Sequence, residues 1–160
     1  MNIIKQKDPV MEVSMVNISE KTRVYREAIA VGSIRLNSDT IRKLKSGQTG
    51  KGDAIQIAKI TGIQAAKLTP LLIPLCHPIH IEHVDIKTKI LKGSVEITAK
   101  VVSEGKTGVE MEALTAVSVA LLNIWDVVKA YEKDEKGQYP STALERISVK
   151  SKVKRKIGNP

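Results

Sequence analysis

A cysteine and a histidine stand side by side in the stretch LIPLCHPIH (72–80), with a proline on either side. Cys76 could be a nucleophile with His77 as its base, either residue could bind a metal, or both could line a binding pocket. Neighbouring residues of an extended chain point to opposite sides, whereas a nucleophile and its base must lie within hydrogen-bonding distance. Cys76 and His77 are therefore poorly placed to be a catalytic pair by themselves.

A metal site in this stretch would need further ligands, and His80 and His83 follow at intervals of three residues. Such spacing converges on a helix, which Pro78 disfavours, and the sequence has no second cluster of cysteines and histidines. We expect no metal site. Two interpretations remain: a rigid pocket wall in which His77 donates a hydrogen bond or carries a proton, and a small buried cysteine with no function.

Acidic residues stand at two places along one predicted helix. Glu110 and Glu112 open the helix, where carboxylates commonly offset the helix dipole. Asp126 and Lys129 are three residues apart and share one face, either as a weak surface ion pair or as an acid–base pair with mutually shifted pKa values. Because Asp126 follows Trp125 in an apolar run, we favour a partly buried, functional pair.

Two glycine-containing loops each carry a lysine. EGKTGVE (104–110) resembles the end of a phosphate-binding P-loop, but Lys100 stands where that motif requires a glycine, so it is not a Walker motif. Free N–H groups at the start of the following helix, together with Lys106, could still hold an anion, although an ordinary loop explains the pattern equally well. GQTGKGD (47–53) has the same two interpretations, with Lys51 as its charge.

The spacing of apolar residues predicts a ferredoxin-like α+β fold. Strands are predicted at 23–36, 84–90, 95–101 and 146–157, and helices at 38–47, from 54 to Leu68 with a further turn opened by Thr69 and Pro70, and at 109–133. The order βαββαβ predicts an antiparallel sheet with helices packed on one face. We expect a single domain over 1–160, with a flexible tail at 1–13 and a core at 14–157.

Composition limits the partners and the location of the chain. Its 160 residues include 26 basic and 17 acidic ones, and the net charge of +9 favours an anionic partner. With no Phe, one Trp and three Tyr it has few side chains on which bases could stack, so we expect no nucleic-acid partner. A single cysteine, and an N-terminal stretch without a long apolar run, predict a cytoplasmic protein with no membrane partner.

Three stretches together resemble the cyclic pyranopterin monophosphate synthase (MoaC) family of molybdenum cofactor biosynthesis: KGD (51–53), GIQAAKLTPLLIPLCHP (62–78) and TGVEMEALTAVSVALLNIWDVVKA (107–130). The resemblance implies a ferredoxin-like fold and a homohexamer built as a trimer of dimers. It implies conversion of 3′,8-cyclo-7,8-dihydroguanosine 5′-triphosphate to cyclic pyranopterin monophosphate, with release of pyrophosphate. No cofactor is implied, although a divalent cation could accompany the triphosphate.

The resemblance also implies roles for individual residues. Asp126 matches the family's active-site aspartate, Lys129 the lysine that follows it, and Lys51 the lysine of KGD. These lysines could transfer protons if their pKa values are lowered toward neutrality, with Asp126 holding Lys129. The implied substrate-binding residues are Leu75, Cys76, His77, Glu110, Met111, Glu112, Lys67, Arg26 and Lys21.

The chain departs from the family pattern at three places. Asn17 stands where the family often has aspartate, and Trp125 where it often has tyrosine. The basic stretch VKSKVKRKI (149–157) replaces a Gly-Gly-Lys-Ser segment, which leaves the role of the C-terminal strand open. Two other functions therefore remain alternatives: a basic ferredoxin-like module that binds RNA, and an inactive oligomer that binds a nucleotide.

Spacing along the last predicted helix has one geometric consequence. Glu112 and Asp126 lie fourteen residues apart, or about 21 Å at the usual rise per residue, which one small substrate cannot easily span. We expect each pocket to be shared, with one subunit supplying Asp126 and Lys129 and a neighbour supplying 110–112 or Lys51. The candidate contact between subunits is a seam of alanines, Ala113, Ala116 and Ala120.

Overall fold

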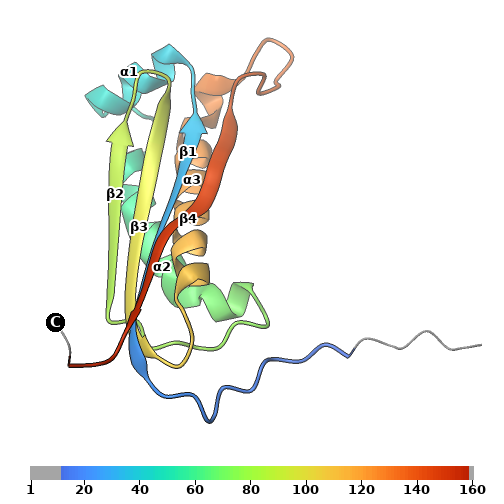
Figure 1. Cartoon of the computed structure of the whole chain (residues 1–160). Coiled ribbons are helices and arrows are strands. Elements are labelled where there is room, and N and C mark those ends of the chain that lie inside the picture. The colour runs from blue at the N-terminus through green and yellow to red at the C-terminus, as the bar shows by residue number, and fades with distance from the viewer. Residues whose placement is uncertain (1–11, 159–160) are drawn as a thin grey trace, which may run out of the picture.

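The computed structural model describes residues 12–158 as a four-stranded antiparallel sheet with helices on one face (Figure 1). The elements are β1 (Val24–Arg35), α1 (Ser38–Ser46), α2 (Ala54–Leu72), β2 (His83–Ile90), β3 (Ser94–Gly105), α3 (Glu110–Glu132) and β4 (Ala143–Arg155). The strand order is β2-β3-β1-β4, with antiparallel neighbours throughout. The predicted ferredoxin-like α+β fold is confirmed. Most of the predicted tail, 1–11, lies outside the described residues.

Helix α3 lies across the middle of the sheet because small residues of β1 let it come close. Ala28 and Ala30 are fully buried beneath the helix layer. A Cβ atom on Gly32 would lie 2.8 Å from Cγ1 of Val117 and 3.0 Å from Cδ1 of Leu121. Every second residue of β1 therefore belongs to the floor on which α3 packs.

Among the described residues, α3 is the one helix whose length and composition would allow it to span a membrane. Its 23 residues pack instead against β1, β3, β4 and α2. Fully buried positions recur along its length at Val117, Leu121, Ile124 and Val128. Burial in the core therefore accounts for its apolar composition.

Helices α2 and α3 pack closely through small residues. A Cβ atom on Gly62 would lie 3.2 Å from the carbonyl oxygen of Ala116 and 3.4 Å from Cβ of Ala120. The alanine seam that the sequence assigned to another subunit is fully buried here, against α2 of the same chain. That assignment is wrong, because Gly62 gives α2 the close approach that the alanines permit.

The loop between α1 and α2 is held at both ends by helix caps. Gly47, in the left-handed conformation with φ of 68°, ends α1. Oδ1 of Asp53 accepts the N–H groups of Ile55 and Gln56 at 2.9 and 3.1 Å and so starts α2. The conformation of the loop that carries Lys51 is thus restricted from both sides.

Helix α2 continues through Pro70 to Leu72. The sequence predicted a break after Leu68 with Thr69 as the cap of a new turn. That detail is wrong, because the Thr69 hydroxyl donates to the carbonyl of Ala65 at 3.3 Å, as in a helix interior. The segment 73–80 therefore leaves directly from the end of one long helix.

Candidate active site

The residues singled out from the sequence gather at the two opposite ends of the α2–α3 pair (Figure 1). Because the two helices are antiparallel, the loop before α2 lies beside the C-terminal half of α3, where Lys51 contacts Asp126. The segment after α2 lies beside the N-terminus of α3, where Cys76 and Glu112 line one hollow. The candidate residues therefore form two separate groups within one chain, which we call half-sites.

The first half-site is a carboxylate between two ammonium groups. Oδ2 of Asp126 lies 2.7 Å from Nζ of Lys51, and Oδ1 lies 2.8 Å from Nζ of Lys129. Lys51 also donates to the backbone carbonyl of Asp126 at 3.2 Å. The sequence left open whether a neighbouring subunit supplies residues 110–112 or Lys51. Because Lys51 contacts Asp126 of its own chain, this contact favours residues 110–112.

Charge neutralisation sets the protonation of this half-site. The hydrogen bond from Lys129, followed by the one from Lys51, lowers the pKa of Asp126 to about 2. The same hydrogen bond raises the pKa of Lys129. This is opposite to the lowered value that proton transfer by Lys129 would require, because the ammonium is paired and open to solvent.

The Asp126 half-site is also more exposed than its sequence suggests. The Asp126 side chain is 53% exposed, so the expectation of partial burial is wrong for the single chain. The neighbouring Trp125 is partly buried and packs edge-on against Tyr139, with ring centroids 5.7 Å apart. Asp126 and Lys129 border a shallow, open depression together with Leu122 and Trp125.

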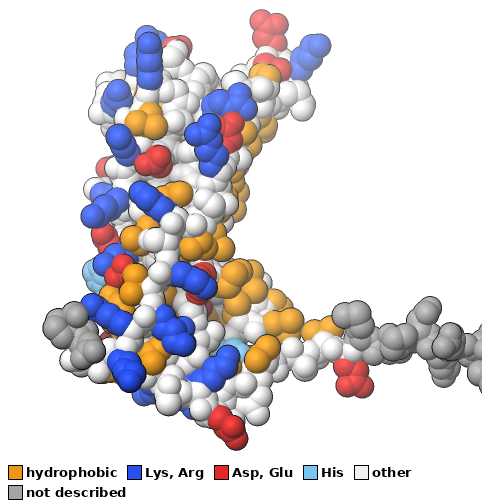
Figure 2. Space-filling view, viewed as in Figure 1, with side chains coloured by type: hydrophobic (Ala, Val, Ile, Leu, Met, Phe, Trp, Pro, Cys, Tyr) orange, Lys and Arg blue, Asp and Glu red, His pale blue; other side chains and the backbone are white. Residues whose placement is uncertain are grey.

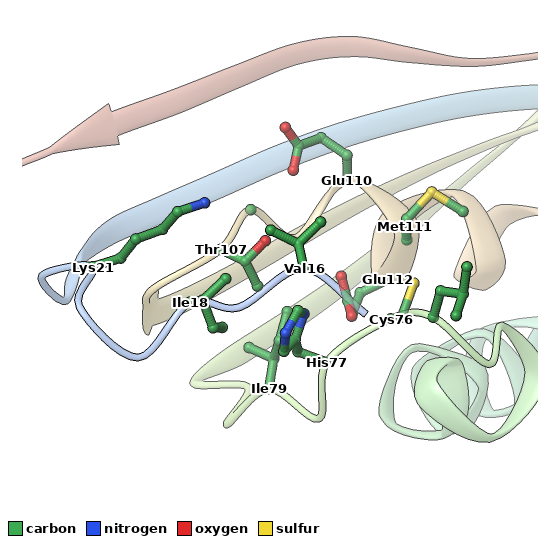
Figure 3. Close-up of a pocket in the computed structure, with 12 residues that line it drawn as sticks. Val16, Ile18, Lys21, Cys76, His77, Ile79, Thr107, Glu110, Met111 and Glu112 are labelled. Carbon is green, nitrogen blue, oxygen red and sulfur yellow. The ribbon is translucent and has the colours of Figure 1, made fainter. Parts of the chain in front are cut away.

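The second half-site is a hollow of about 410 Å³ at the N-terminal end of α3 (Figure 3). Three segments far apart in the sequence form it: the chain before β1, the stretch after α2, and the β3–α3 turn with the first residues of α3. Its lining residues are Val16, Ile18, Lys21, Leu75, Cys76, His77, Ile79, Thr107, Gly108, Glu110, Met111 and Glu112.

Glu112 is the most unusual residue of this hollow. Its side chain lines the hollow although the residue is only 2% exposed, and neither carboxylate oxygen has a hydrogen-bond partner among the described residues. Burial raises its pKa, and the charge of Glu110 adds to the effect. Burial and then the charge of Glu112 raise the pKa of Cys76. Cys76 therefore stays a neutral thiol, which argues against a thiolate nucleophile.

Glu110 points away from Cys76 and His77, toward strands β1 and β4 (Figure 3). Its Oε1 lies 3.0 Å from Nζ of Lys152 on β4. Burial would raise the pKa of Glu110, but the hydrogen bond from Lys152 and a backbone hydrogen bond, together with the charges of Lys152 and Arg26, outweigh it, and the pKa is lowered. Glu110 and Glu112 lie in one helical turn, yet the pKa of Glu110 is lowered and that of Glu112 is raised.

The remaining candidates are placed less uniformly. Lys21, Leu75 and Met111 line the hollow beside Glu112. Arg26 lies on β1 next to Glu110, and its guanidinium donates to the carbonyl of Lys106 at 3.5 Å. Lys67 is exposed on α2 and is not among the residues that line the hollow. Its assignment to the substrate stays a prediction.

Within residues 12–158, no three side chains of His, Cys, Asp or Glu lie close enough together to hold a metal ion. Nε2 of His80 lies 3.7 Å from Oε1 of Glu82, and His80 does not line the hollow that contains Cys76. The expectation of a metal-free site stays a prediction.

A comparison with protein families matches residues 15–155 to the MoaC family, from the chain before β1 to the end of β4. This chain belongs to the MoaC family. The match includes both half-sites and the basic strand β4.

Individual MoaC-family relatives are similar over nearly their whole length. A protein of Sulfurisphaera tokodaii is 54% identical over 143 residues, which are 89% of this chain and 95% of the relative. One of Thermococcus kodakarensis is 56% identical over 142 residues, 89% of this chain and 91% of the relative. One of Methanococcoides burtonii is 52% identical over 145 residues, 91% of each. All three are named "Probable cyclic pyranopterin monophosphate synthase".

Sequence reasoning missed several residues that line the MoaC-family hollow. Val16 and Ile18 come from the chain before β1, close to the stretch predicted to be a tail, and no periodicity marked them. Gly108 was read only as part of a loop, yet a Cβ atom there would collide with the carboxylate of Glu110. Thr107 and Ile79 carried no signal of their own.

Proposed function

We propose that this chain is a cytoplasmic cyclic pyranopterin monophosphate synthase, a lyase of molybdenum cofactor biosynthesis. Its substrate is 3′,8-cyclo-7,8-dihydroguanosine 5′-triphosphate, and its products are cyclic pyranopterin monophosphate and pyrophosphate. The observation that carries this proposal is the family match, with relatives named for the activity that are 51 to 56% identical over about nine-tenths of the chain. The cluster of Lys51, Asp126 and Lys129 supports it, because rearranging a purine to a pterin requires repeated proton transfers.

Lys51 and Lys129 are the proposed proton carriers, and Asp126 holds them. In the single chain Asp126 raises the pKa of Lys129, so the lysine is a stable cation. Covering the exposed cluster with substrate or with another subunit removes water, and desolvation lowers the pKa of an ammonium group. The cluster is thus a resting arrangement that closure of the pocket would activate.

The hollow at the other end supplies the groups for the guanine-derived ring. Glu112 presents two oxygens that have no hydrogen-bond partner within residues 12–158, and Cys76 presents a neutral thiol that can donate a hydrogen bond. His77, beside them, can donate or accept. Leu75, Met111 and the apolar lining cover the faces of the ring system. Burying a carboxylate that has no protein partner costs free energy, and such a group is expected where a ligand supplies the hydrogen bonds.

Basic residues supply the counter-charge for the triphosphate. Lys21 lines the hollow, Arg26 lies beside Glu110, and Lys67 is the remaining candidate. Positive charge here stabilises the departing pyrophosphate as the cyclic phosphate closes. The proposed reaction needs no cofactor, and a divalent cation could enter with the triphosphate.

We further propose a homohexamer, arranged as a trimer of dimers, in which each active site combines the two ends of α3 from different subunits. Two features support sharing. Asp126 and Glu112 are separated by about 21 Å along one helix. The helix layer also carries exposed apolar side chains, among them Ile60, Leu71 and Leu122. The small-molecule substrate is then the only proposed partner besides further copies of the chain.

The test is a turnover assay with the enzymatically prepared cyclic triphosphate, following pyrophosphate and the fluorescent oxidation product of the pterin. We expect product from the wild-type protein and none from Lys51→Ala or Asp126→Ala. Lys87→Ala, which removes an exposed lysine from β2, is the matched control and should keep full activity. A folded, oligomeric wild-type protein that forms no product would refute the proposal.

A further inference from the structure

Strand β4 breaks the regular alternation of its side chains at Lys150. Val149 pairs with Ala30 of β1, and Ser151 pairs with the adjacent Ile29, so Lys150 is an extra residue on β4. An extra residue in one strand is a β-bulge, and it reverses the face on which every later side chain lies. A second irregularity occurs earlier in the strand, where Arg146 has φ of 56°.

The bulge decides which residues of β4 face the helices. Beyond it, Lys152 pairs with Ala28 and Lys154 with Arg26, both on the helix side of β1. Val153 is 43% exposed, and Arg155 stacks on Tyr25 of the open face, 4.1 Å from the ring centroid. Without the bulge, Ser151 and Val153 would face the helices, and the lysines would lie on the open face of the sheet.

The two lysines thereby reach a small hollow at the N-terminus of α3. The hollow has a volume of about 180 Å³, and Arg26, Lys152 and Lys154 contribute its positive charges. Glu110 lies 3.0 Å from Lys152. Figure 2 shows Lys and Arg side chains gathered over this end of β4.

Two carboxylates also border this small hollow, but its three cations outnumber them. Glu27 is engaged elsewhere, because its Oε2 lies 2.9 Å from Nζ of Lys100 and accepts the Tyr25 hydroxyl. Glu110 pairs with Lys152, but that ammonium is 71% exposed. Exposed ion pairs are weak, so a polyvalent anion can take the lysine over from Glu110.

The small hollow adjoins the hollow that contains Glu112. Gly108 and Glu110 line both of them. A ligand whose ring lies against Glu112 therefore has this cationic hollow next to it. Three cations on two neighbouring strands match the charge of a diphosphate better than that of a single phosphate.

We propose that Lys152 and Lys154, with Arg26, form a diphosphate-binding subsite beside the main hollow, placed there by the bulge at Lys150. The subsite would hold the two outer phosphates of a nucleoside triphosphate, and the same groups after they leave as pyrophosphate. Its role in catalysis rests on the proposed function, whereas its binding of diphosphate does not. Strand β4 would thus provide an anion site where the family often has Gly-Gly-Lys-Ser.

The experiment measures binding of inorganic pyrophosphate by calorimetry. We expect Lys152→Ala/Lys154→Ala to weaken binding by about tenfold or more, because each lysine gives a charge-assisted hydrogen bond. Lys87→Ala/Lys89→Ala on β2 removes the same charge from the same sheet and should leave affinity unchanged. Equal losses in the two double variants would overturn the proposal, since net charge alone would then explain binding.

A charge-conserving variant tests the face of the strand directly. Lys152→Val combined with Val153→Lys keeps the composition but moves one lysine to the open face. We expect pyrophosphate affinity to fall severalfold. Unchanged affinity in this variant, with unfolding temperature and oligomer size retained, would refute a subsite on the helix side.

A final comparison separates binding of the outer phosphates from binding of the nucleoside, and binding from turnover. GTP should bind the double variant more weakly than the wild type, while GMP should bind both alike; equal behaviour of GTP and GMP would count against the subsite. If wild-type turnover fails while pyrophosphate binding follows the position of the lysines, the subsite stands and the proposed function falls. If the wild type turns over substrate but pyrophosphate binding does not depend on the positions of the two lysines, the proposed function stands and the subsite falls.

Discussion

The ammonium group of Lys51 lies 2.7 Å from Oδ2 of Asp126 and so connects the loop before α2 to the C-terminal half of α3. The contact spans 75 positions of sequence. It depends on the antiparallel packing of α2 and α3 at Gly62 and Ala116, because that packing sets the height of the loop along α3. Lys51, the proposed catalytic lysine, is therefore positioned by a helix interface that contains none of the proposed catalytic residues.

The first prediction concerns the titration of Asp126. Its pKa is about 2 in the folded chain, against 3.8 for an unperturbed aspartate. A lowered carboxyl pKa stabilises the fold above about pH 4, and that contribution is lost as the pH falls toward 2. The side-chain carboxyl carbon of Asp126 should accordingly titrate near pH 2 by NMR.

Substitution of the main hydrogen-bond donor gives the matched comparison for this titration. In Lys129→Met the pKa of Asp126 should move back toward 3.8, since Lys51 alone remains. Lys87→Met, on β2, should leave it unchanged. A midpoint near 3.8 in the wild-type protein would mean that the two lysines do not hold the carboxylate in solution.

The second prediction is that Glu112→Gln stabilises the empty protein. Burial raises the pKa of Glu112, so the folded chain binds its proton more tightly than the unfolded chain does. Stability should therefore fall as the pH rises from about 4.5 through the raised pKa, and glutamine should remove this fall. We expect a gain on the order of 1 kcal/mol at pH 8, measured by denaturant unfolding, together with weaker substrate binding.

The sign of the change in the free energy of unfolding distinguishes a ligand-binding carboxylate from a structural one. At pH 4 the wild type and Glu112→Gln should have nearly equal free energies of unfolding, because the carboxyl is then mostly protonated. Glu132 is also a buried carboxylate, but it accepts the Asn37 N–H at 3.1 Å and the Thr142 hydroxyl at 2.5 Å. Glu132→Gln should lower stability, and a loss of the same size in Glu112→Gln would contradict the prediction.

The third prediction assigns Tyr131 a positioning role for the Lys51 loop. Its hydroxyl accepts the N–H of Gly50, the residue before Lys51, at 2.9 Å. Tyr131→Phe removes this acceptor and should lower kcat by about two- to tenfold with little change in KM. Hydrogen exchange at the Gly50 amide should accelerate in parallel, which reports directly on the loop.

A second tyrosine provides the control for this effect. Tyr25→Phe also removes a single hydroxyl hydrogen bond, the one donated to Glu27 at 2.7 Å on the open face of the sheet. It should leave both kcat and Gly50 exchange unaltered. A wild-type kcat in Tyr131→Phe would show that the caps at Gly47 and Asp53 order the loop without help from Tyr131.

Local periodicity predicted the elements and the contacts within them. The three–four spacing of apolar residues located α3 within about one residue at each end, and the same spacing predicted that Asp126 and Lys129 meet. Alternation located the β2–β3 hairpin. These signals succeed because they depend on residues that are close in sequence.

Contacts between elements could not be predicted in this way. The contact of Lys152 with Glu110 depends on the bulge at Lys150, and an alternating sequence does not mark where an extra residue is inserted. The exposure of Asp126 was missed because an apolar run cannot show that this side chain points away from the core. The alanine seam was correctly identified as a close-packing surface but assigned to the wrong partner, since small residues indicate close approach and not which helix approaches.

The last prediction tests how subunits share a site. If each pocket takes Asp126 from one subunit and Glu112 from another, mixing Asp126→Ala and Glu112→Ala subunits leaves about one pocket in four with both residues, by random assortment. Mixing Lys51→Ala with Asp126→Ala should restore nothing, because these residues meet within one chain. Activity recovered in the first mixture and absent from the second, in verified mixed oligomers, is the expected result. Recovery in the second mixture instead would place Lys51 and Asp126 of one pocket on different subunits, and no recovery in either would mean that every pocket is built by a single chain.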